Sequence, residues 1–374
     1  MSPPSRAVRD ACLAMLDDYA RHGAAAWIRQ FESRERLRAR LAQILGAAAE
    51  EVALVPGTGH AVSMIATAID WRPGDRILLL RGEFPTNVTP WQRAALRHSL
   101  DVVFLDAAAF ARGGEGLELL ARELERGVRL LAVSAVQFQT GMRMPLGSIA
   151  ALCSAAGTQV FVDAIQAAGA VPIDVAALGI DYLAAGGHKW LMGVEGAGLL
   201  WIRADRAREL EPAIAGWLSH EDGARFLFEG GGLLRYDRPL RRRADVFEIG
   251  VTNALGFAAL DASTALLAAI GIERIERHVN AILDELESGF AARGFMSSRA
   301  LDPAARSCIL SLTPPLDVDL AALARALAER GVAVSTPDGY LRLAPHWPND
   351  RSQVGPVLDA LDDALRAVSG ARVP

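Results

Sequence analysis

Short apolar segments alternate with amphipathic helical patterns through the middle of the chain. The apolar segments occupy residues 51–55, 76–80, 101–105, 129–134, 159–163, 182–185 and 198–202. Strands that are apolar on both faces are typical of a mostly parallel sheet covered by helices. Their alternation with helical patterns predicts an α/β domain. We therefore expect a mostly parallel seven-stranded sheet in this part of the chain.

Helical patterns flank the sheet region on both sides. Residues 5–45 predict two amphipathic helices that part near Gly23, and residues 254–293 predict a long helical segment with a break near Gly271. The stretch 203–250 is irregular and predicts loops that border a site. The C-terminal part predicts a smaller α+β unit. Its expected elements are strands at 307–313, 332–335 and 339–343 and helices at 318–330 and 351–367.

Composition excludes several classes of protein. The chain has 374 residues, of which 51% are hydrophobic and 22% charged, so we expect a folded protein. A net charge of −5 without a basic block argues against a nucleic-acid or membrane partner. Cys12, Cys153 and Cys308 form no CxxC pair, which argues against a disulfide framework and against a metal site. With neither a signal-peptide pattern nor a membrane-span pattern, we expect a cytoplasmic protein.

The basic residues are divided very unevenly. The chain has one lysine, Lys189, and 38 arginines. Arginine serves wherever charge alone is needed, but it cannot become the neutral amine that attacks a carbonyl carbon. Lys189 follows an apolar segment, which suggests a covalent role as a Schiff-base lysine. The alternative is a surface lysine in a chain whose codon usage favours arginine.

Two further motifs point to a phosphorylated pyridine. Asp163 ends an apolar segment, where ligands of α/β sheets bind, and a carboxylate there can keep a pyridine nitrogen protonated. Gln166 can reach a ring hydroxyl or face solvent. Thr58 is the expected N-cap of a helix opened by Gly59 and His60, and the N–H groups of such a helix bind phosphate. The alternatives are a helix-capping Asp163 and an ordinary turn at Thr58.

Together these motifs fit pyridoxal 5'-phosphate, and the sequence resembles the class V aminotransferase family of enzymes that use it. That family includes cysteine desulfurases, selenocysteine lyases, kynureninases and isopenicillin-N epimerase-like proteins. The segments that carry the resemblance are Val162-Asp163-Ala164-Ile165-Gln166, Gly187-His188-Lys189-Trp190, Glu195-Gly196-Ala197-Gly198, Glu83-Phe84-Pro85-Thr86-Asn87, Phe247-Glu248-Ile249-Gly250-Val251-Thr252-Asn253 and Tyr340-Leu341-Arg342-Leu343-Ala344-Pro345-His346.

The resemblance implies the fold type I architecture of pyridoxal phosphate-dependent transferases. It has a large domain built on a mostly parallel seven-stranded sheet and a smaller C-terminal α+β domain. On this basis we expect an N-terminal helical segment, 1–22, that packs with the small domain, a large cofactor-binding domain, 23–255, and a small domain, 256–374. Family members are usually homodimers, so we expect a homodimer.

The resemblance also implies roles for single residues. Lys189 would form the Schiff base and move the substrate proton, Asp163 would hold the ring nitrogen, Gln166 the ring hydroxyl, and Phe84 the ring face. The phosphate contacts would come from Thr58, Gly59, His60 and His188, and from Thr252 reaching the partner subunit's phosphate. The substrate contacts would come from Arg342, which grips the carboxylate, and from Gln137 and Trp217. No metal is implied.

The sequence departs from the family pattern at several positions. Gly186 stands where the family often has a serine, which removes one phosphate hydroxyl. Val251 stands where the family has a phosphate-binding threonine, with Thr252 one position later. Phe138 stands where desulfurases carry asparagine, which favours the epimerase-like or kynureninase-like members. The family's opening strand is not found before the first helix, so we expect either a missing wall of the substrate site or a misplaced start.

The reaction type stays open among related chemistries. Residues 331–341 contain no cysteine, which argues against desulfuration through a cysteine persulfide, and Cys308 lies in an apolar strand pattern. We expect an enzyme that acts at Cα of an amino acid, most like the epimerase-like members. The alternatives are a transaminase and a cysteine or selenocysteine lyase. A non-catalytic binding protein of the same fold is the alternative from another class.

Overall fold

The computed structural model describes residues 2–250 and 253–370. It divides into two compact units, each considered by itself below. Unit 1 consists of Met1–Ala135 and Pro145–Ala269, and unit 2 of Val136–Met144 and Ile270–Pro374. The domain boundaries expected from the sequence, after residues 22 and 255, stay predictions.

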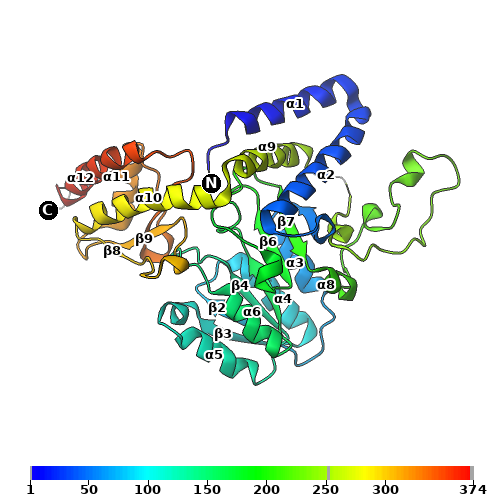
Figure 1. Cartoon of the computed structure of the whole chain (residues 1–374), viewed down its shortest axis with the longest axis horizontal. Coiled ribbons are helices and arrows are strands. Elements are labelled where there is room, and N and C mark those ends of the chain that lie inside the picture. Colours follow the sequence, from blue (N-terminus) through cyan, green and yellow to red (C-terminus); the bar gives the residue numbers. More distant parts are fainter. Residues whose placement is uncertain (1, 251–252, 371–374) are drawn as a thin grey trace. The chain divides into compact units, whose positions relative to one another are not determined.

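Unit 1 is built on the predicted seven-stranded sheet, which confirms the expected fold class (Figure 1). Its strands are β1 (Val52–Val55), β2 (Arg76–Arg81), β3 (Asp101–Asp106), β4 (Leu130–Ser134), β5 (Gln159–Asp163), β6 (Tyr182–Gly186) and β7 (Gly198–Ile202). Their order across the sheet is β1-β7-β6-β5-β4-β2-β3. Strands β2 to β6 pair in parallel, and β7 is antiparallel to both of its neighbours.

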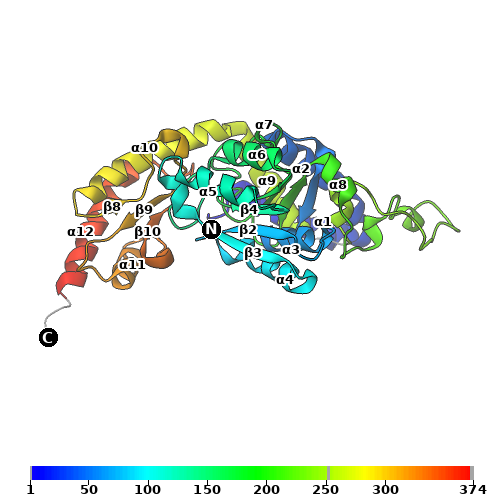
Figure 2. The same cartoon turned by 90° about the horizontal axis from the view of Figure 1, so that it is seen from below.

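Helices cover both faces of this sheet. The helices of unit 1 are α1 (Arg6–His22), α2 (Ala26–Leu45), α3 (Thr58–Ala68), α4 (Thr89–His98), α5 (Glu115–Leu124), α6 (Leu146–Ala155), α7 (Val175–Leu178), α8 (Ala204–Glu209) and α9 (Ala254–Ile270), of which α1 packs on α2 rather than on the sheet. Figure 2 shows α5 and α6 on one face and α3 and α4 on the other. The predicted break near Gly23 is confirmed, because this residue is the C-cap of α1. Covering both faces buries β1 and β4 to β7 completely, which explains their continuous apolar segments, whereas the edge strand β3 is only partly buried.

A buried ion cluster attaches α2 to the sheet in unit 1. The carboxylate of Glu248 accepts hydrogen bonds from the Arg34 and Arg38 guanidinium groups and, at 2.8 Å, from the Leu54 N–H. Burial by itself raises the pKa of Glu248, but the charges and hydrogen bonds of the two arginines outweigh it, and the pKa is lowered. Glu248, which belongs to the segment 247–253, therefore stabilises the fold.

Unit 2 contains α10 (Ile272–Ala291), α11 (Leu320–Glu329) and α12 (Val354–Gly370). Its antiparallel sheet has the order β10 (Leu341–Leu343), β9 (Leu310–Thr313) and β8 (Met296–Ser297). The strand predicted at 332–335 is wrong. Ser335 forms only an isolated bridge with Arg342, and Pro337, which has no N–H to donate, follows soon after. Strand β8 was not expected.

The stretch 203–250, predicted to be loops, is mostly irregular but contains α8. It also contains the short 3-10 turns Trp217–Ser219, Arg225–Leu227 and Ala244–Phe247. Short turns of this kind carry no clear periodicity, so the sequence pattern could not predict them.

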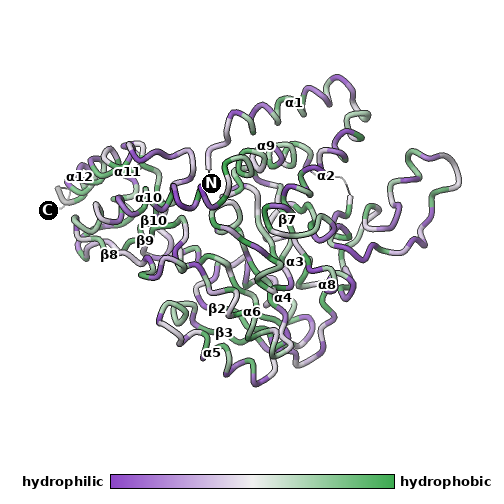
Figure 3. Tube along the Cα trace, in the orientation of Figure 1, coloured by the Kyte–Doolittle hydropathy of each residue, from purple (hydrophilic) through white to green (hydrophobic). Residues whose placement is uncertain are grey.

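Hydrophobic residues follow the central strands and α9 in Figure 3. In the part of the chain that the structure describes, no single helix is long and apolar enough to cross a membrane. Helices α9 and α10 meet that length and composition criterion only when they are taken together across the break at Gly271. The location in the cytoplasm stays a prediction.

Candidate active site

The strand order reverses at the carboxyl ends of β2 and β4. From β2 the chain goes to β3 on one side, then returns to β4 on the other side and continues to β5 and β6. Ligands of open α/β sheets bind where the strand order reverses in this way. Phe84, Asp163 and Lys189 lie at or just after the carboxyl ends of β2, β5 and β6. We take this end of the sheet as the candidate active site.

Asp163 is the buried acid of the site. Its side chain is 2% exposed, and its Oδ1 accepts the Ile165 N–H at 2.9 Å. Burial raises the pKa of Asp163 to about 7, and the nearby Glu83 contributes to the rise, while the Ile165 N–H and Lys189 oppose it. Because this carboxyl takes up a proton near neutral pH, it can share one with a pyridine nitrogen.

Gln166 is buried, which excludes the solvent-facing alternative. Its side-chain carbonyl oxygen accepts the indole N–H of Trp190 at 3.0 Å. This bond connects the segment after β5 with the lysine segment after β6. The bond also fixes the orientation of the Gln166 amide, because its oxygen faces Trp190. The NH₂ group is then the part of the side chain that can donate to a ring hydroxyl.

The N-terminus of α3 has the features of a phosphate site. The N-cap is Gly57, so the prediction that Thr58 caps the helix is wrong by one residue. Thr58 is instead the first helical residue and is 4% exposed, and its hydroxyl has no hydrogen-bond partner within the described chain. Gly59 and His60 are exposed in the same turn. A buried hydroxyl without a partner is costly, and a bound phosphate oxygen would satisfy it beside the N–H groups of the helix. The site therefore fits pyridoxal phosphate.

Lys189 lies in a tight turn between β6 and β7. The Gly187 N–H donates to the Ala197 carbonyl at 2.8 Å, and the Gly193 N–H donates to the Gly187 carbonyl at 2.8 Å. A Cβ atom on Gly187 would lie 2.8 Å from the Ala197 oxygen, so only glycine fits there. Met192 has a left-handed φ of 54°. The turn is thus held by its own backbone, and it presents the half-buried Lys189 toward the Phe84 ring.

Phe84 is 43% exposed, and the Lys189 Nζ lies 5.5 Å from the centre of its ring. Phe84 follows β2 and Lys189 follows β6, and β4 and β5 lie between these two strands in the sheet. The fold therefore brings together the expected ring-stacking residue and the expected covalent lysine.

His188 is half-buried beside Lys189. Burial lowers the pKa of His188, and the charge of Lys189 lowers it further. A Cβ atom on Gly186 would lie 2.9 Å from the His188 Cε1. The missing serine at position 186 thus has a second consequence, because glycine leaves space for the imidazole, a group that can itself donate to a phosphate.

The expected substrate residues Arg342 and Gln137 lie in unit 2. Arg342 is half-buried, its Nε donates to the Ser335 hydroxyl at 3.0 Å, and its Nη1 donates to the Phe138 carbonyl. Burial lowers the pKa of Arg342. Gln137 is buried, and its N–H donates to the Met142 carbonyl at 2.9 Å. Arg342 is therefore a held side chain and not a solvated surface arginine.

Trp217 belongs to an aromatic cluster in unit 1. Its ring stacks with that of Trp27 at a centroid distance of 6.0 Å and meets Phe226 edge-on at 6.1 Å. The expected substrate role of Trp217 stays a prediction. Thr252 and Val251 lie outside the described residues.

One residue at the candidate site, Glu83, was not predicted to have a role. Glu83 is 8% exposed and accepts a hydrogen bond from the Ser134 N–H at 2.7 Å. An acidic residue immediately before the expected stacking residue Phe84 is the sequence signal that could have identified it.

All three cysteines have raised pKa values. Burial raises the pKa of Cys153 and of Cys308 to about 12 and also raises the pKa of Cys12. A thiol needs a lowered pKa to be a good nucleophile at neutral pH. Among the described residues, no three His, Cys, Asp or Glu side chains form a group that could hold a metal ion.

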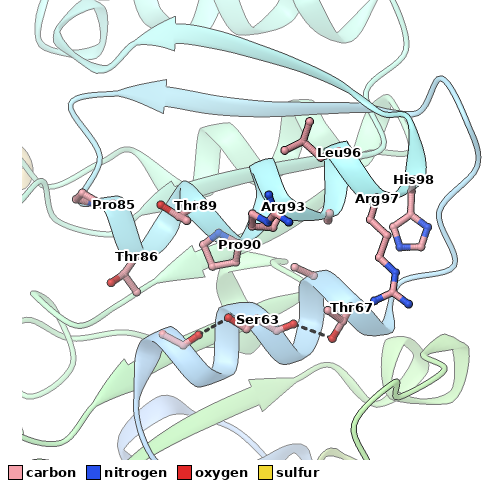
Figure 4. Close-up of a pocket in the computed structure, with 13 residues that line it drawn as sticks. Ser63, Thr67, Pro85, Thr86, Thr89, Pro90, Arg93, Leu96, Arg97 and His98 are labelled. Carbon is pink, nitrogen blue, oxygen red and sulfur yellow. Dashed lines mark hydrogen bonds between the residues drawn. The ribbon is translucent and has the colours of Figure 1, made fainter.

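A groove of about 700 Å³ lies between α3 and α4, beginning at Gly59 (Figure 4). Pro85, Pro90 and Leu96 contribute apolar surface, and Leu96 is 74% exposed. Arg93, Arg97 and His98 add positive charge. The groove therefore joins the proposed phosphate end of α3 to an exposed, largely apolar face.

Known proteins with similar sequences were then compared. The model of the family Aminotransferase class-V matches residues 20–341. The uncharacterized aminotransferase YcbU of Bacillus subtilis is 27% identical over 362 residues, which cover 96% of this chain and 90% of that protein. A probable cysteine desulfurase of Xylella fastidiosa is 32% identical over 260 residues, which cover 68% of this chain and 59% of that protein. The match therefore spans less than two thirds of this desulfurase.

Solved structures show the same fold. A complex of the cystine C-S lyase C-DES with its product cysteine persulfide has a TM-score of 0.87 at 24% identity, covering 96% of this chain and 94% of that one. An apo cysteine desulfurase from Thermococcus onnurineus has a TM-score of 0.85 at 23% identity, covering 99% and 93%. The chain belongs to the class V aminotransferase family of pyridoxal phosphate-dependent enzymes.

Proposed function

We propose that this protein acts at Cα of an α-amino acid, with Lys189 as the covalent and proton-transferring residue. The observation that carries the proposal is the contact of Lys189 with Phe84, together with the buried Asp163, on which the charge of Lys189 acts. An amine, a ring face and an acid with a raised pKa are the three groups that a pyridine aldehyde needs.

Four residues are proposed to hold the cofactor. When bound, pyridoxal phosphate supplies an aldehyde for amines and a ring that withdraws electrons from Cα. The Thr58 hydroxyl and the N–H groups at the start of α3 hold the phosphate, with His188 as a further donor. Asp163 keeps a proton at the ring nitrogen, and Gln166 donates to the ring hydroxyl.

Substrate handling falls to Lys189 and Arg342. The amine of Lys189 removes the Cα proton and can return it, which is general base and then general acid catalysis. The guanidinium of Arg342 pairs with the substrate carboxylate through two parallel hydrogen bonds. Gln137 and Trp217 are proposed as further substrate contacts.

Among reactions at Cα, we propose an epimerase-like reaction, in which a proton returns to the opposite face of Cα and no other bond of the substrate is broken. The raised pKa values of all three cysteines support this choice, because desulfuration through a persulfide needs a reactive thiolate. Elimination from cysteine or cystine is the second candidate. It is favoured by the likeness to a cystine C-S lyase structure, and it does not require a protein cysteine. Transamination is the third.

A panel of L-amino acids in deuterated water separates these reactions. Exchange at Cα with formation of the D-enantiomer and no keto acid supports the epimerase-like reaction. Pyruvate with sulfide supports elimination, and a keto acid with pyridoxamine phosphate supports transamination. Lys189→Arg protein is the control and should show none of these. If the purified protein takes up no added pyridoxal phosphate, the proposed enzymatic function is wrong, and a non-catalytic protein of this fold is favoured.

We further propose that the protein is a homodimer in which the second copy covers the groove between α3 and α4. The exposed Leu96 and the continuity of the groove with Gly59 support this site, and Thr252 would then serve the partner subunit's phosphate. Leu96→Glu should yield monomers with weaker cofactor binding, measured by light scattering and by absorbance. Leu316→Glu, at a fully exposed position of unit 2, is the matched control and should stay dimeric.

A further inference from the structure

Strands β2 and β4 separate toward their carboxyl ends. They pair only at Ile77 with Leu130 and at Leu78 with Leu131. In contrast, β2 pairs with β3 along its whole length, and β4 does the same with β5. The far end of β4 therefore has no ladder with β2 in the described chain, and we call this unpaired region beside the candidate site the opening.

Glu83 fills the opening. Its Oε1 accepts the Ser134 N–H at 2.7 Å, and its Oε2 accepts the Ser134 hydroxyl and, at 3.4 Å, the Asn87 amide. The side chain is 8% exposed and Asn87 is fully buried. Because both oxygens accept hydrogen bonds, the arrangement fits an ionised carboxylate, which has no proton to donate. The Ser134 N–H thus donates to a carboxylate oxygen of Glu83 instead of to a backbone carbonyl of β2.

Ser134 links this charge to Asp163. The two residues are opposite each other in the parallel pair of β4 and β5, and the next N–H, that of Ala135, donates to the Asp163 carbonyl at 2.8 Å. Among the described residues, the charged groups that act on Asp163 are Glu83, after β2, and Lys189, after β6. Glu83 raises the pKa of Asp163 and Lys189 lowers it.

We propose that Glu83 is a positioning residue for Asp163. It closes the opening between β2 and β4 and places a second buried negative charge one strand away. A proton therefore stays with Asp163, or with the ring nitrogen that Asp163 holds, to a higher pH than a single carboxylate would allow. This inference rests on the role proposed above for Asp163, and Glu83 acts through that residue without contact to the substrate.

Carboxyl ¹³C NMR of the cofactor-free full chain tests the proposal, with Asp163→Asn identifying the Asp163 signal. Glu83→Gln keeps the size of the side chain and removes its charge, so the titration midpoint of Asp163 should fall by about one pH unit. Ser134→Ala removes one hydrogen bond but keeps the charge, so the midpoint should stay near the wild-type value. An unchanged midpoint in folded Glu83→Gln protein overturns the proposal.

A measurement on the wild-type chain covers the case in which Glu83→Gln does not fold. The Ser134 amide proton reports the charge of the carboxylate to which it donates. Its chemical shift should change in an acid step of its own, separate from the step of Asp163, and a single step shared with Asp163 overturns the proposal. Cofactor uptake distinguishes a failure of the proposed function from a failure of the role proposed for Glu83. If wild-type protein binds pyridoxal phosphate but the midpoints contradict Glu83, only the role of Glu83 fails.

Discussion

The Nζ of Lys189 lies 5.5 Å from the centre of the Phe84 ring, although the two residues follow strands that are not neighbours in the sheet. A cation at this distance from an aromatic face is attracted to it. The contact holds the only lysine of the chain beside the expected ring-stacking residue at the candidate site.

Lys189→Arg should keep the fold and lose covalent cofactor attachment. Arginine preserves the positive charge beside Phe84, so the melting temperature should change little, but its guanidinium does not become a neutral amine. Borohydride treatment followed by intact-protein mass spectrometry measures the result. Wild-type protein should gain one cofactor mass per chain and the variant none. A cofactor adduct on the variant would show that another group forms the attachment.

Thr58→Val should weaken cofactor binding without destabilising the protein. The hydroxyl of Thr58 has no partner within the described chain, so replacing it with a methyl group removes no intramolecular hydrogen bond. It does remove a donor to the phosphate, which should raise the Kd by about tenfold, as for loss of a hydrogen bond to a charged group.

Thr67→Val is the matched control for this change. Thr67 lies later in α3, and its hydroxyl donates to the Ser63 carbonyl at 2.8 Å. Its replacement should leave the Kd for pyridoxal phosphate unchanged. Absorbance titration and urea unfolding measure the two properties, and a Thr58→Val protein that binds the cofactor as tightly as wild type would exclude the phosphate role.

Asp163 should make the stability of the cofactor-free protein depend on pH. Its pKa in the folded chain is about 7, above the ordinary value of 3.8, so between these values the folded state holds a proton that the unfolded state has released. The contribution of Asp163 to the free energy of unfolding therefore falls as pH rises from about 4 to 7, by up to about 4 kcal/mol, and is level above that range.

Asp163→Asn removes this titration while keeping the shape of the side chain. Urea unfolding at pH 5 and pH 8 should show a smaller loss of stability at the higher pH for the variant than for wild type. Equal losses in the two proteins would mean that Asp163 is ionised in the folded chain well below neutral pH.

Arg342→Lys should raise the KM for the amino acid substrate and leave cofactor binding intact. Lysine keeps the charge but cannot form two parallel hydrogen bonds to a carboxylate. Loss of a charged hydrogen bond predicts a KM higher by about 10- to 100-fold. Ser335→Ala, which removes only the 3.0 Å bond that orients the Arg342 Nε, should have a smaller effect. Steady-state kinetics measures both, and an unchanged KM in Arg342→Lys would exclude the carboxylate role.

Local patterns predicted most of the fold. The seven strands of unit 1 and the breaks at Gly23 and Gly271 follow from apolar runs and from glycine, since both report local burial and backbone conformation. The strand expected at 332–335 failed, because its composition favours a strand but only Ser335 finds a partner, Arg342. Pairing of this kind is not local and leaves no mark on the composition of one segment.

The sequence by itself determined the α/β class and the family and suggested a covalent role for a single lysine, because apolar periodicity and residue chemistry are local properties. Only the tertiary structure decided which groups meet. Strand order left the carboxyl ends of β2 and β4 unpaired with each other, placed Phe84 near Lys189, and brought the Glu83 carboxylate to Ser134 at the end of β4. Burial then raised the pKa of Asp163 and left the Thr58 hydroxyl without a partner. These properties come from distance and desolvation between residues far apart in the chain, which no local pattern encodes.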